Sequence, residues 1–463
     1  MSDYVFGSYI LEILTAGMYQ DSRIIFREYI QNACDAIDEA VSLGMMSRRE
    51  DGEIRIDIDP DARNITIEDN GTGISAEEFV RVMGSIADSD KSQSENKGFR
   101  GIGKLCGLAY CSTAVFSAKF RGEGVVSRLE CNAKIMRELV GEDADNNYKA
   151  VEILNLVNEF KSEDTEDIDG HYFRVELKGI NEENTDLLDF ERVKEYLSFA
   201  APLPYDNGFM PYGRRIHEHA GKLGVKIDEY NIFVNGEQLF KGYTPEFTTS
   251  LGSDEIFGLE FHDFVDDNNN LIAWMWFGIS RFRGVIKNGT LMRGIRLRKK
   301  NIQLGNEYTL QKLFQEDRGI NYFIGEVFCV SEDLVLSAHR EYFIENPARY
   351  AIETQLREYF MELKKIYYDS SRVYNLFKKV DGTESGIKAL ADIDRLRMKG
   401  GVIRRVIEHI EAERTHEDVI HDTHTCRHQS KKDAMLAKIF DIIKANTDHD
   451  TAEKIILQIR DRA

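Results

Sequence analysis

A polar stripe on one predicted helix is the feature of the sequence best suited to chemistry. Residues 24–43 have the spacing of an amphipathic helix, and at about 100° per residue Glu28, Asn32 and Asp35 fall on one side of it. A carboxylate can accept a proton from water, and a carboxamide oxygen can bind a divalent cation without adding charge. A solvated surface helix is the alternative, although such a face would be expected to contain Lys and Arg as well. The apolar residues on the opposite side are Phe26, Ile30, Ala33, Ile37 and Val41.

A β-hairpin is predicted shortly after this helix. Isoleucine alternates with polar residues over 54–58 and again over 65–67, with a turn at 60–64 between them. The second strand leads into Asp69-Asn70-Gly71-Thr72-Gly73. The two glycines permit a sharp turn and a close approach to a ligand, and Asp69 is a directional acceptor at the strand end.

A second glycine-containing segment is suited to a polyphosphate. Lys97-Gly98-Phe99-Arg100-Gly101-Ile102-Gly103-Lys104 precedes a small and apolar run at 105–110, which predicts a loop that leads into a helix N-terminus. Free backbone N–H groups and the helix dipole at such a site favour phosphate. The segment lacks the Gly-Lys-Ser/Thr ending of a P-loop, and no strand directly precedes it as in a Rossmann fingerprint.

In this order, the three motifs resemble those of the GHKL ATPases. The matching residues are Glu28-x-x-x-Asn32-Ala-x-Asp35-Ala, Asp69-x-Gly71-x-Gly73 and Gly98-x-x-Gly101-x-Gly103. Within that superfamily the chain is most similar to the ninety-kilodalton heat-shock (HtpG-like) chaperones, over roughly residues 4–370. Three ordered motifs are far more specific than any one of them alone.

The resemblance implies a site for ATP and Mg²⁺. Glu28 would activate the attacking water and Asn32 would bind Mg²⁺, while Asp69 would accept a hydrogen bond from the adenine amine. Asp35 would shape the adenine end through water. The other nucleotide-binding residues implied are Gly71, Gly73, Ile74, Gly98, Arg100, Gly101, Ile102 and Gly103.

A further catalytic residue is implied far along the chain. The segment Ser331–Glu341 resembles the stretch that contains the catalytic arginine of these chaperones, and it places Arg340 at that position. A guanidinium stays charged and can donate two hydrogen bonds to a γ-phosphate. A surface ion pair of Arg340 with Glu341 or Glu345 is the alternative.

Two positions depart from the family pattern. Asp88 replaces a lysine of the lid, which is predicted around 84–98, and its carboxylate would repel phosphate if it pointed inward. His171 follows Gly170 where the family has a threonine that helps to bind a water at the adenine.

Composition and charge narrow the class of protein. The 463 residues suffice for about three domains, and 42% hydrophobic content supports folded cores. A formal net charge of −20 disfavours wrapping around a nucleic acid, which needs a basic footprint. The start of the chain has no signal pattern, and the apolar run 271–279 is too short for a membrane span, so we expect a cytoplasmic protein. Six scattered cysteines without a Cys-x-x-Cys pair indicate reduced thiols.

The predicted fold class is α/β, with an N-terminal GHKL (Bergerat) sandwich. We expect an ATP-binding domain at 1–180, a connecting helix and linker at 181–205, a middle α/β domain with the catalytic arginine at 206–350, and a helical region at 351–463. The acidic stretch 158–170 is expected to be a surface loop.

Two clusters leave alternatives open. The basic residues after position 292 could face phosphate or nucleic acid, although strand alternation would direct half of them to solvent. The residues His416, His421, His424, Cys426 and His428 could bind a metal, but their spacing matches no compact tetrahedral pattern. The members of the basic cluster are Arg293, Arg296, Arg298, Lys299 and Lys300.

Two function classes remain. One is a chaperone-like ATPase, a homodimer in which nucleotide closes a clamp over a client protein. The other is a GHKL ATPase that acts with nucleic acid or with a dedicated defence or repair partner, as in the MutL and MORC groups. A sensor histidine kinase is disfavoured because the Glu28 helix begins too near the N-terminus to follow a phospho-acceptor domain.

Overall fold

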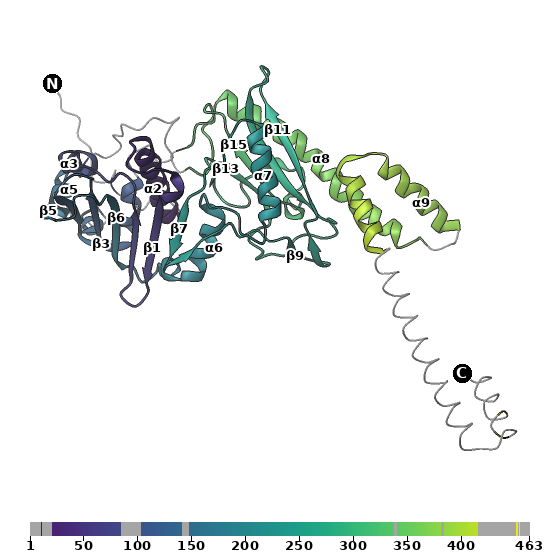
Figure 1. Cartoon of the computed structure of the whole chain (residues 1–463), viewed down its shortest axis with the longest axis horizontal. Coiled ribbons are helices and arrows are strands. Elements are labelled where there is room, and N and C mark those ends of the chain that lie inside the picture. The colour runs from purple at the N-terminus through teal and green to yellow at the C-terminus, as the bar shows by residue number, and fades with distance from the viewer. Residues whose placement is uncertain are drawn as a thin grey trace. The chain divides into compact units, whose positions relative to one another are not determined.

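The computed structural model describes residues 11, 21–84, 103–140, 148–337, 340–380, 384–414, 451 and 453. The chain divides into two compact units, residues 1–367 and 368–463. Both large β-sheets belong to the first unit (Figure 1). The mixed α/β fold class is therefore confirmed.

The first sheet has eight strands in the order β5-β4-β3-β6-β2-β1-β7-β8. All neighbours are antiparallel except β1 and β7, which are parallel. The strands are β1 (Glu53–Asp59), β2 (Asn64–Asp69), β3 (Cys111–Lys119), β4 (Val125–Cys131), β5 (Asn158–Asp164), β6 (Tyr172–Ile180), β7 (Asn231–Val234) and β8 (Glu237–Gln238).

The predicted hairpin is confirmed as β1 and β2. Ile56 pairs with Ile67, and Ile58 with Ile65, so that their side chains share one face of the sheet. This face forms one core with the apolar side of helix α2 (Ile24–Ser42), which explains why the isoleucines alternate with polar residues. The remaining helices around this sheet are η1 (Arg49–Asp51), α3 (Ala76–Gly84), η2 (Gly103–Ala109), α4 (Ala133–Val140), α5 (Ala150–Val157), η3 (Thr185–Leu188) and α6 (Phe190–Ala200).

Two strands of this sheet come from a segment beyond α6. Asn235 and Gly236 both have positive φ, 47° and 79°, as a two-residue Asn-Gly hairpin turn between β7 and β8 requires. The Asn235 side chain also accepts from the Ile58 N–H at 2.7 Å. Residues 231–238 therefore extend the sheet that contains Asp69. The predicted domain boundaries at 180, 205 and 350 stay predictions.

The expectation that 158–170 is a loop is wrong for its first half. Residues 158–164 form β5, an edge strand paired with β4 from Val125↔Asp164 to Cys131↔Asn158. Four of the six exposed β5 side chains are charged, the others being Phe160 and Ser162, and Lys161 offsets the repulsion between the acidic ones by pairing with Glu159 at 2.9 Å and Glu130 at 3.6 Å. Backbone pairing and cross-strand charges thus replace the apolar alternation that identifies other strands.

The second sheet has five strands in the order β11-β12-β15-β13-β14. Helix α7 (Met210–Lys222) packs against β11 (Figure 1) and shares a core with Trp274 and Trp276 of β12. Strand β12, which lies between β11 and β15, is buried almost throughout. The strands are β11 (Gly258–Val265), β12 (Leu271–Ile279), β13 (Gly294–Lys299), β14 (Ile302–Gln303) and β15 (Ile324–Cys329); β9 (Glu246–Thr249) pairs separately with β10 (Gly252–Glu255), and η4 (Gln311–Leu313) and η5 (Gly319–Tyr322) are short 3₁₀ turns.

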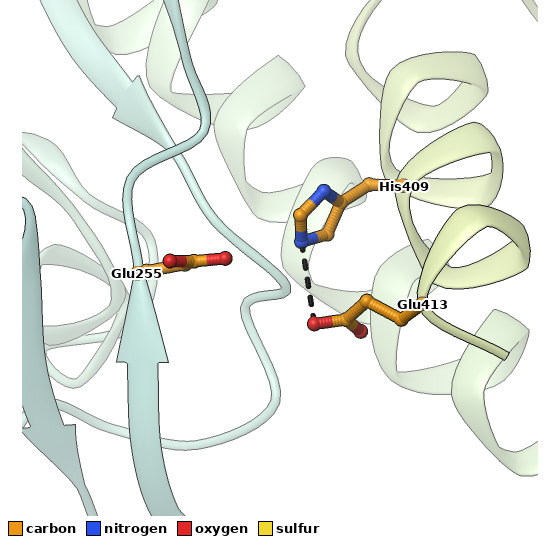
Figure 2. Close-up of side chains that lie close together, drawn as sticks. All are labelled: Glu255, His409 and Glu413. Atoms are coloured by element: carbon orange, nitrogen blue, oxygen red, sulfur yellow. Dashed lines mark ion pairs between the residues drawn. The ribbon is translucent and has the colours of Figure 1, made fainter. Parts of the chain in front are cut away.

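The described part of the second unit is helical. It contains the end of α8 (Pro347–Phe377), α9 (Glu384–Arg397) and a helix at 401–414. Gly400 and Gly401 have positive φ where the chain passes from α9 to the helix at 401–414. Figure 2 shows His409 and Glu413 one turn apart on the last helix, with Nε2 and Oε1 at 3.5 Å. The His/Cys cluster at 416–428 lies outside the described residues. Among the residues that are described, no helix is long and apolar enough to cross a membrane.

Candidate functional site

Helix α2 buries two of the three polar residues that its sequence places on one stripe. Glu28 is 2% exposed and Asp35 is 4% exposed, whereas Asn32 is half-buried. A carboxylate is seldom buried without a partner, because removing its charge from water costs several kcal/mol. The environment of Glu28 therefore matters most for the chemistry of this helix.

Two guanidinium groups lie beside Glu28. Arg340 Nη1 is 3.0 Å from Glu28 Oε2, and Arg27 Nη2 is 3.7 Å from Glu28 Oε1. Arg340 is 6% exposed, so its charge is buried together with that of the carboxylate. The structure thus brings together a residue of the first sheet's helix and a residue that follows the second sheet. The alternative of a surface ion pair does not describe this buried arginine.

Arg340 is placed by a short hairpin. Leu336 and Phe343 form an isolated β-bridge, and the Ser337 N–H donates to the Tyr342 carbonyl at 2.8 Å. Arg340 lies in the turn with φ of 52°, a left-handed conformation that few residues other than glycine adopt. Such strain persists only where surrounding contacts stabilise it, and it is common at active sites.

The end of β2 forms a tight turn beside α2. Asp69 is 5% exposed, and its Oδ1 accepts from the Gly71 N–H at 2.9 Å. A Cβ at Gly71 would lie 2.5 Å from Ala36 Cβ, and one at Gly73 would lie 1.9 Å from the Lys119 carbonyl oxygen. Both glycines are thus required by contacts within the protein itself. Ile74, which follows the turn, is half-buried against the first core.

His171 makes a contact that the sequence motifs did not indicate. Its Nδ1 is 2.6 Å from the Gly71 carbonyl oxygen, and its Nε2 is 2.9 Å from Arg121 Nη2. Arginine only donates and a carbonyl only accepts, so these contacts require the tautomer with the proton on Nδ1. The residue that replaces the family threonine therefore supports the turn after Asp69.

The glycine-rich loop is described only at its end. Gly98, Arg100, Gly101 and Ile102 lie outside the described residues, as does Asp88, and Gly103 begins the 3₁₀ helix η2. This helix lies against α2, because the Gly107 N–H donates to the Tyr29 hydroxyl at 3.2 Å. Burial and then the charge of Glu28 raise the pKa of the Cys106 thiol, which keeps this cysteine neutral.

The basic cluster faces inward, and the expectation that half of it meets solvent is wrong. Arg298 is fully buried and donates to Glu326 and to the Phe199 carbonyl, the latter at 2.6 Å. Lys241 Nζ lies 3.1 Å from Glu326 Oε1. Tyr205 Oη donates to Glu326 Oε2 at 2.6 Å, and Trp276 Nε1 donates to it at 3.0 Å. The exposed fractions of the other members are 7% for Arg293, 3% for Arg296 and 9% for Lys299, and Lys300 is half-buried.

The donor set around Glu28 fits a magnesium nucleotide. Arg340 Nη1 already lies 3.0 Å from Glu28 Oε2, but among the described residues Glu28 Oε1 and Gln31 Oε1 are buried without a hydrogen-bond partner. Buried polar atoms normally have such partners, so these atoms are suited to bind water or a ligand. The half-buried Asn32, next along α2, offers a further neutral amide oxygen of the kind that Mg²⁺ can bind.

Comparisons with known proteins agree with this geometry. Residues 21–165, less than half of the chain, match the sequence model of the family described as histidine kinase-, DNA gyrase B- and HSP90-like ATPase. This match contains α2, the Asp69 turn and η2.

Several curated relatives are named chaperone protein HtpG. The protein of Salinispora tropica is 38% identical over 92 residues, which cover 18% of this chain and 14% of the relative. That of Methylibium petroleiphilum is 37% identical over 103 residues, or 21% of this chain and 15% of the relative. That of Francisella tularensis subsp. holarctica is 26% identical over 279 residues, which cover 58% of this chain and 40% of the relative. The chain spans less than half the length of each of these relatives. Residues 21–165 are therefore similar to the histidine kinase-, DNA gyrase B- and HSP90-like ATPase family, in a chain that is similar to the HtpG chaperones.

Proposed function

We propose that this chain is a chaperone-like, Mg²⁺-dependent ATPase that couples ATP binding and hydrolysis to lid and domain closure over a protein client. The observation that carries the proposal is the 3.0 Å contact between Arg340 and Glu28. The two residues come from separate sequence motifs that both point to ATP hydrolysis. Because the two side chains are buried in contact with each other, ATP hydrolysis is proposed to take place beside them.

Each residue has a defined task in this proposal. Glu28 orients the attacking water and accepts its proton, and Asp69 accepts a hydrogen bond from the adenine amine. Asp35 shapes the adenine end through water. Asn32 supplies its amide oxygen to Mg²⁺, which neutralises the phosphate charge when bound. Backbone N–H groups of residues 100–103 bind the terminal phosphates.

Arg340 has two partners in turn. Its guanidinium offsets the cost of burying the Glu28 carboxylate, as their 3.0 Å separation implies. A γ-phosphate is a second anion that competes for the same guanidinium. Transfer of Arg340 to the phosphate would leave Glu28 free to accept a proton, and it would link hydrolysis to the position of the second sheet.

The client is proposed to be a protein. The curated relatives are named chaperones, and the basic cluster that could have met nucleic acid is buried. A homodimer and a cytoplasmic location are expectations that come with the resemblance to the heat-shock chaperones.

The test uses Glu28→Ala and Asn32→Ala in the full chain. We expect Glu28→Ala to bind ATP normally while hydrolysis falls by about 10²-fold or more, because the proton acceptor is lost while Asn32 and Asp69 still bind the nucleotide. Asn32→Ala should lose affinity for Mg-ATP itself. Calorimetric titration and steady-state ATPase assays measure both effects. Glu39→Ala, an exposed acidic residue of the same helix, is the matched control.

Equal loss of ATP binding in both variants would contradict the assigned roles and make Glu28 a structural acid. The Glu28→Ala protein with ATP also serves as a trap in pull-down experiments. Recovery of a protein supports the client proposal, whereas recovery of nucleic acid would favour the MutL- and MORC-like alternative.

A further inference from the structure

The hairpin that presents Arg340 is attached to the second sheet by a buried lysine. Lys299, the last residue of β13, lies opposite Cys329 of the parallel strand β15 and is 9% exposed. Its Nζ donates to the Ser331 carbonyl at 2.8 Å and to the Leu334 carbonyl at 3.0 Å. These carbonyls belong to the turn that leads from β15 into the hairpin.

The hairpin continues directly from that turn. The Ile344 N–H donates to the Val335 carbonyl at 2.9 Å, and the Arg340 N–H donates to the Ser337 carbonyl at 3.1 Å. These bonds connect the segment that follows Leu334 to the backbone of Arg340 and Ile344. A shift of the turn at Leu334 would be passed on to the Arg340 guanidinium, which lies against Glu28.

A lysine at this buried position costs free energy, which its hydrogen bonds to the turn must offset. Burial lowers the pKa of Lys299, and the charges of Glu332 and Asp333 offset this only in part. An apolar side chain would fill the same space without that cost, but it would remove the lysine donor from the Leu334 carbonyl and leave the Ser331 carbonyl with the Leu334 N–H at 3.3 Å. The ammonium group is thus suited to fixing the turn rather than to filling the core.

The other side of the turn is also fixed. Asn346 Nδ2 donates to the Asp333 carbonyl at 2.7 Å, and Asn346 Oδ1 accepts from the Arg349 N–H at 2.8 Å at the start of α8. The turn at 331–334 is therefore bound to β13 on one side and to α8 on the other.

We propose that Lys299 is a positioning residue for Arg340. Its hydrogen bonds to the Ser331 and Leu334 carbonyls fix the position of the hairpin, so that the Arg340 guanidinium lies against Glu28. This inference rests on the proposed function of Arg340 in ATP hydrolysis. Lys299 acts through the backbone of the turn, whose Ser331 and Leu334 carbonyls accept from its ammonium group.

The test compares Lys299→Met, Lys299→Arg, Arg340→Ala and the Lys299→Met/Arg340→Ala double variant in the full chain. We expect Lys299→Met to lower kcat about tenfold while the Kd for ATP stays within about twofold, because only the arginine is displaced. Lys299→Arg, which keeps a charged donor, should recover most of kcat. In the Arg340→Ala background, Lys299→Met should cause no further loss. Lys287→Met, an exposed lysine beyond β12, is the control.

Hydrogen exchange gives a readout that does not depend on turnover. The Ser337 and Ile344 amides should exchange faster in Lys299→Met than in the parent chain, while the amides of β12 stay unchanged. Unchanged exchange at the hairpin amides, or faster exchange throughout the second sheet, would overturn the positioning role.

The kinetic outcomes separate this inference from the proposed function. Wild-type kcat in Lys299→Met, together with a defective Arg340→Ala, overturns the role of Lys299 and leaves that of Arg340 intact. If the two substitutions lower kcat additively in the double variant, Lys299 does not act through Arg340, and this result also overturns the positioning role. Wild-type turnover in Arg340→Ala removes the arginine from the proposed mechanism, and the role of Lys299 is refuted with it.

Discussion

Asp69 shows how one side chain can serve both the turn and a ligand. One of its oxygens accepts from the Gly71 N–H at 2.9 Å, and the carboxylate is 5% exposed. An asparagine has the same shape and retains one carbonyl oxygen for the Gly71 N–H, while its amide group replaces the second oxygen. The substitution therefore separates the two tasks of Asp69.

We expect Asp69→Asn to weaken ATP and ADP alike by about 1–3 kcal/mol, because a donor then faces the donor of the adenine amine. Guanine nucleotides present a carbonyl at that position, so their affinity should fall less in Asp69→Asn than the affinity for ATP and ADP does. Calorimetric titration with each nucleotide measures the effect. Asp57→Asn, an exposed residue of β1, is the control. Unchanged ATP affinity in Asp69→Asn would remove Asp69 from the site.

At the scale of elements, the network around Glu326 connects strands of the second sheet to the end of α6. Burial alone would raise the pKa of Glu326, but Arg298 and Lys241 outweigh it and lower that pKa to about 2. Arg298 also donates to the Phe199 carbonyl near the C-terminus of α6, where a cation is favoured by the helix dipole. The network thus stabilises the junction between the two sheets.

A lowered pKa makes the contribution of Glu326 dependent on pH. The stabilisation is fully present above the ordinary pKa of 4.5 and is lost as the pH falls from there toward 2. At about 1.4 kcal/mol per pKa unit, its size is on the order of 3 kcal/mol. Glu326→Gln should lower the free energy of unfolding at pH 7 by about 3–5 kcal/mol, because Arg298 and Lys241 lose their counter-charge.

Urea unfolding of the parent chain and of Glu326→Gln, followed by tryptophan fluorescence, measures this difference. Both tryptophans of the chain, Trp274 and Trp276, lie in β12 beside the network. The gap between the two proteins should narrow between pH 5 and pH 3. If the difference in free energy of unfolding stays constant over this range, protonation of Glu326 does not affect the stability of the fold. Glu246→Gln, exposed on β9, should leave stability unchanged at every pH.

The elements that could be predicted from sequence are those whose pattern is local. The isoleucines of β1 and β2, the Asn235-Gly236 turn and the apolar run of β12 each specify an element by neighbouring residues alone. β5 could not be predicted, because an exposed acidic edge strand has no apolar alternation. The burial of Arg298 was also missed, since its partner Glu326 comes from another strand.

The candidate site divides in the same way. The helix stripe at Glu28 and the turn at Asp69 are short motifs that residue types and spacing reveal. Arg340 could be found only through resemblance to a family, because the 3.0 Å contact with Glu28 joins segments distant in sequence. Lys299 and His171 contact backbone carbonyls, which leave no signature in the sequence of their partners.

At the scale of the molecule, the site depends on the full chain. β7 of residues 231–234 pairs with β1, the strand beside the one that ends at Asp69. A fragment that stops at residue 205 would lack this strand, so its activity would not isolate the contribution of the arginine. Variants of Arg340 must therefore be compared in the full chain.

We expect Arg340→Ala to leave the affinity for ATP nearly unchanged and to lower turnover by at least about tenfold, because the guanidinium stabilises charge that develops in the transition state. Arg340→Lys keeps the charge but loses the two-donor fork, so its rate should be intermediate. Steady-state ATPase assays and calorimetric titration measure both variants, with Arg214→Ala on the exposed side of α7 as the control. Loss of the arginine also leaves the buried Glu28 beside Arg27, whose Nη2 lies 3.7 Å from Glu28 Oε1. If Arg340→Ala hydrolyses ATP at the full rate, closure of the second sheet onto the first is not part of catalysis, and the coupling between chemistry and domain movement must arise elsewhere in the chain.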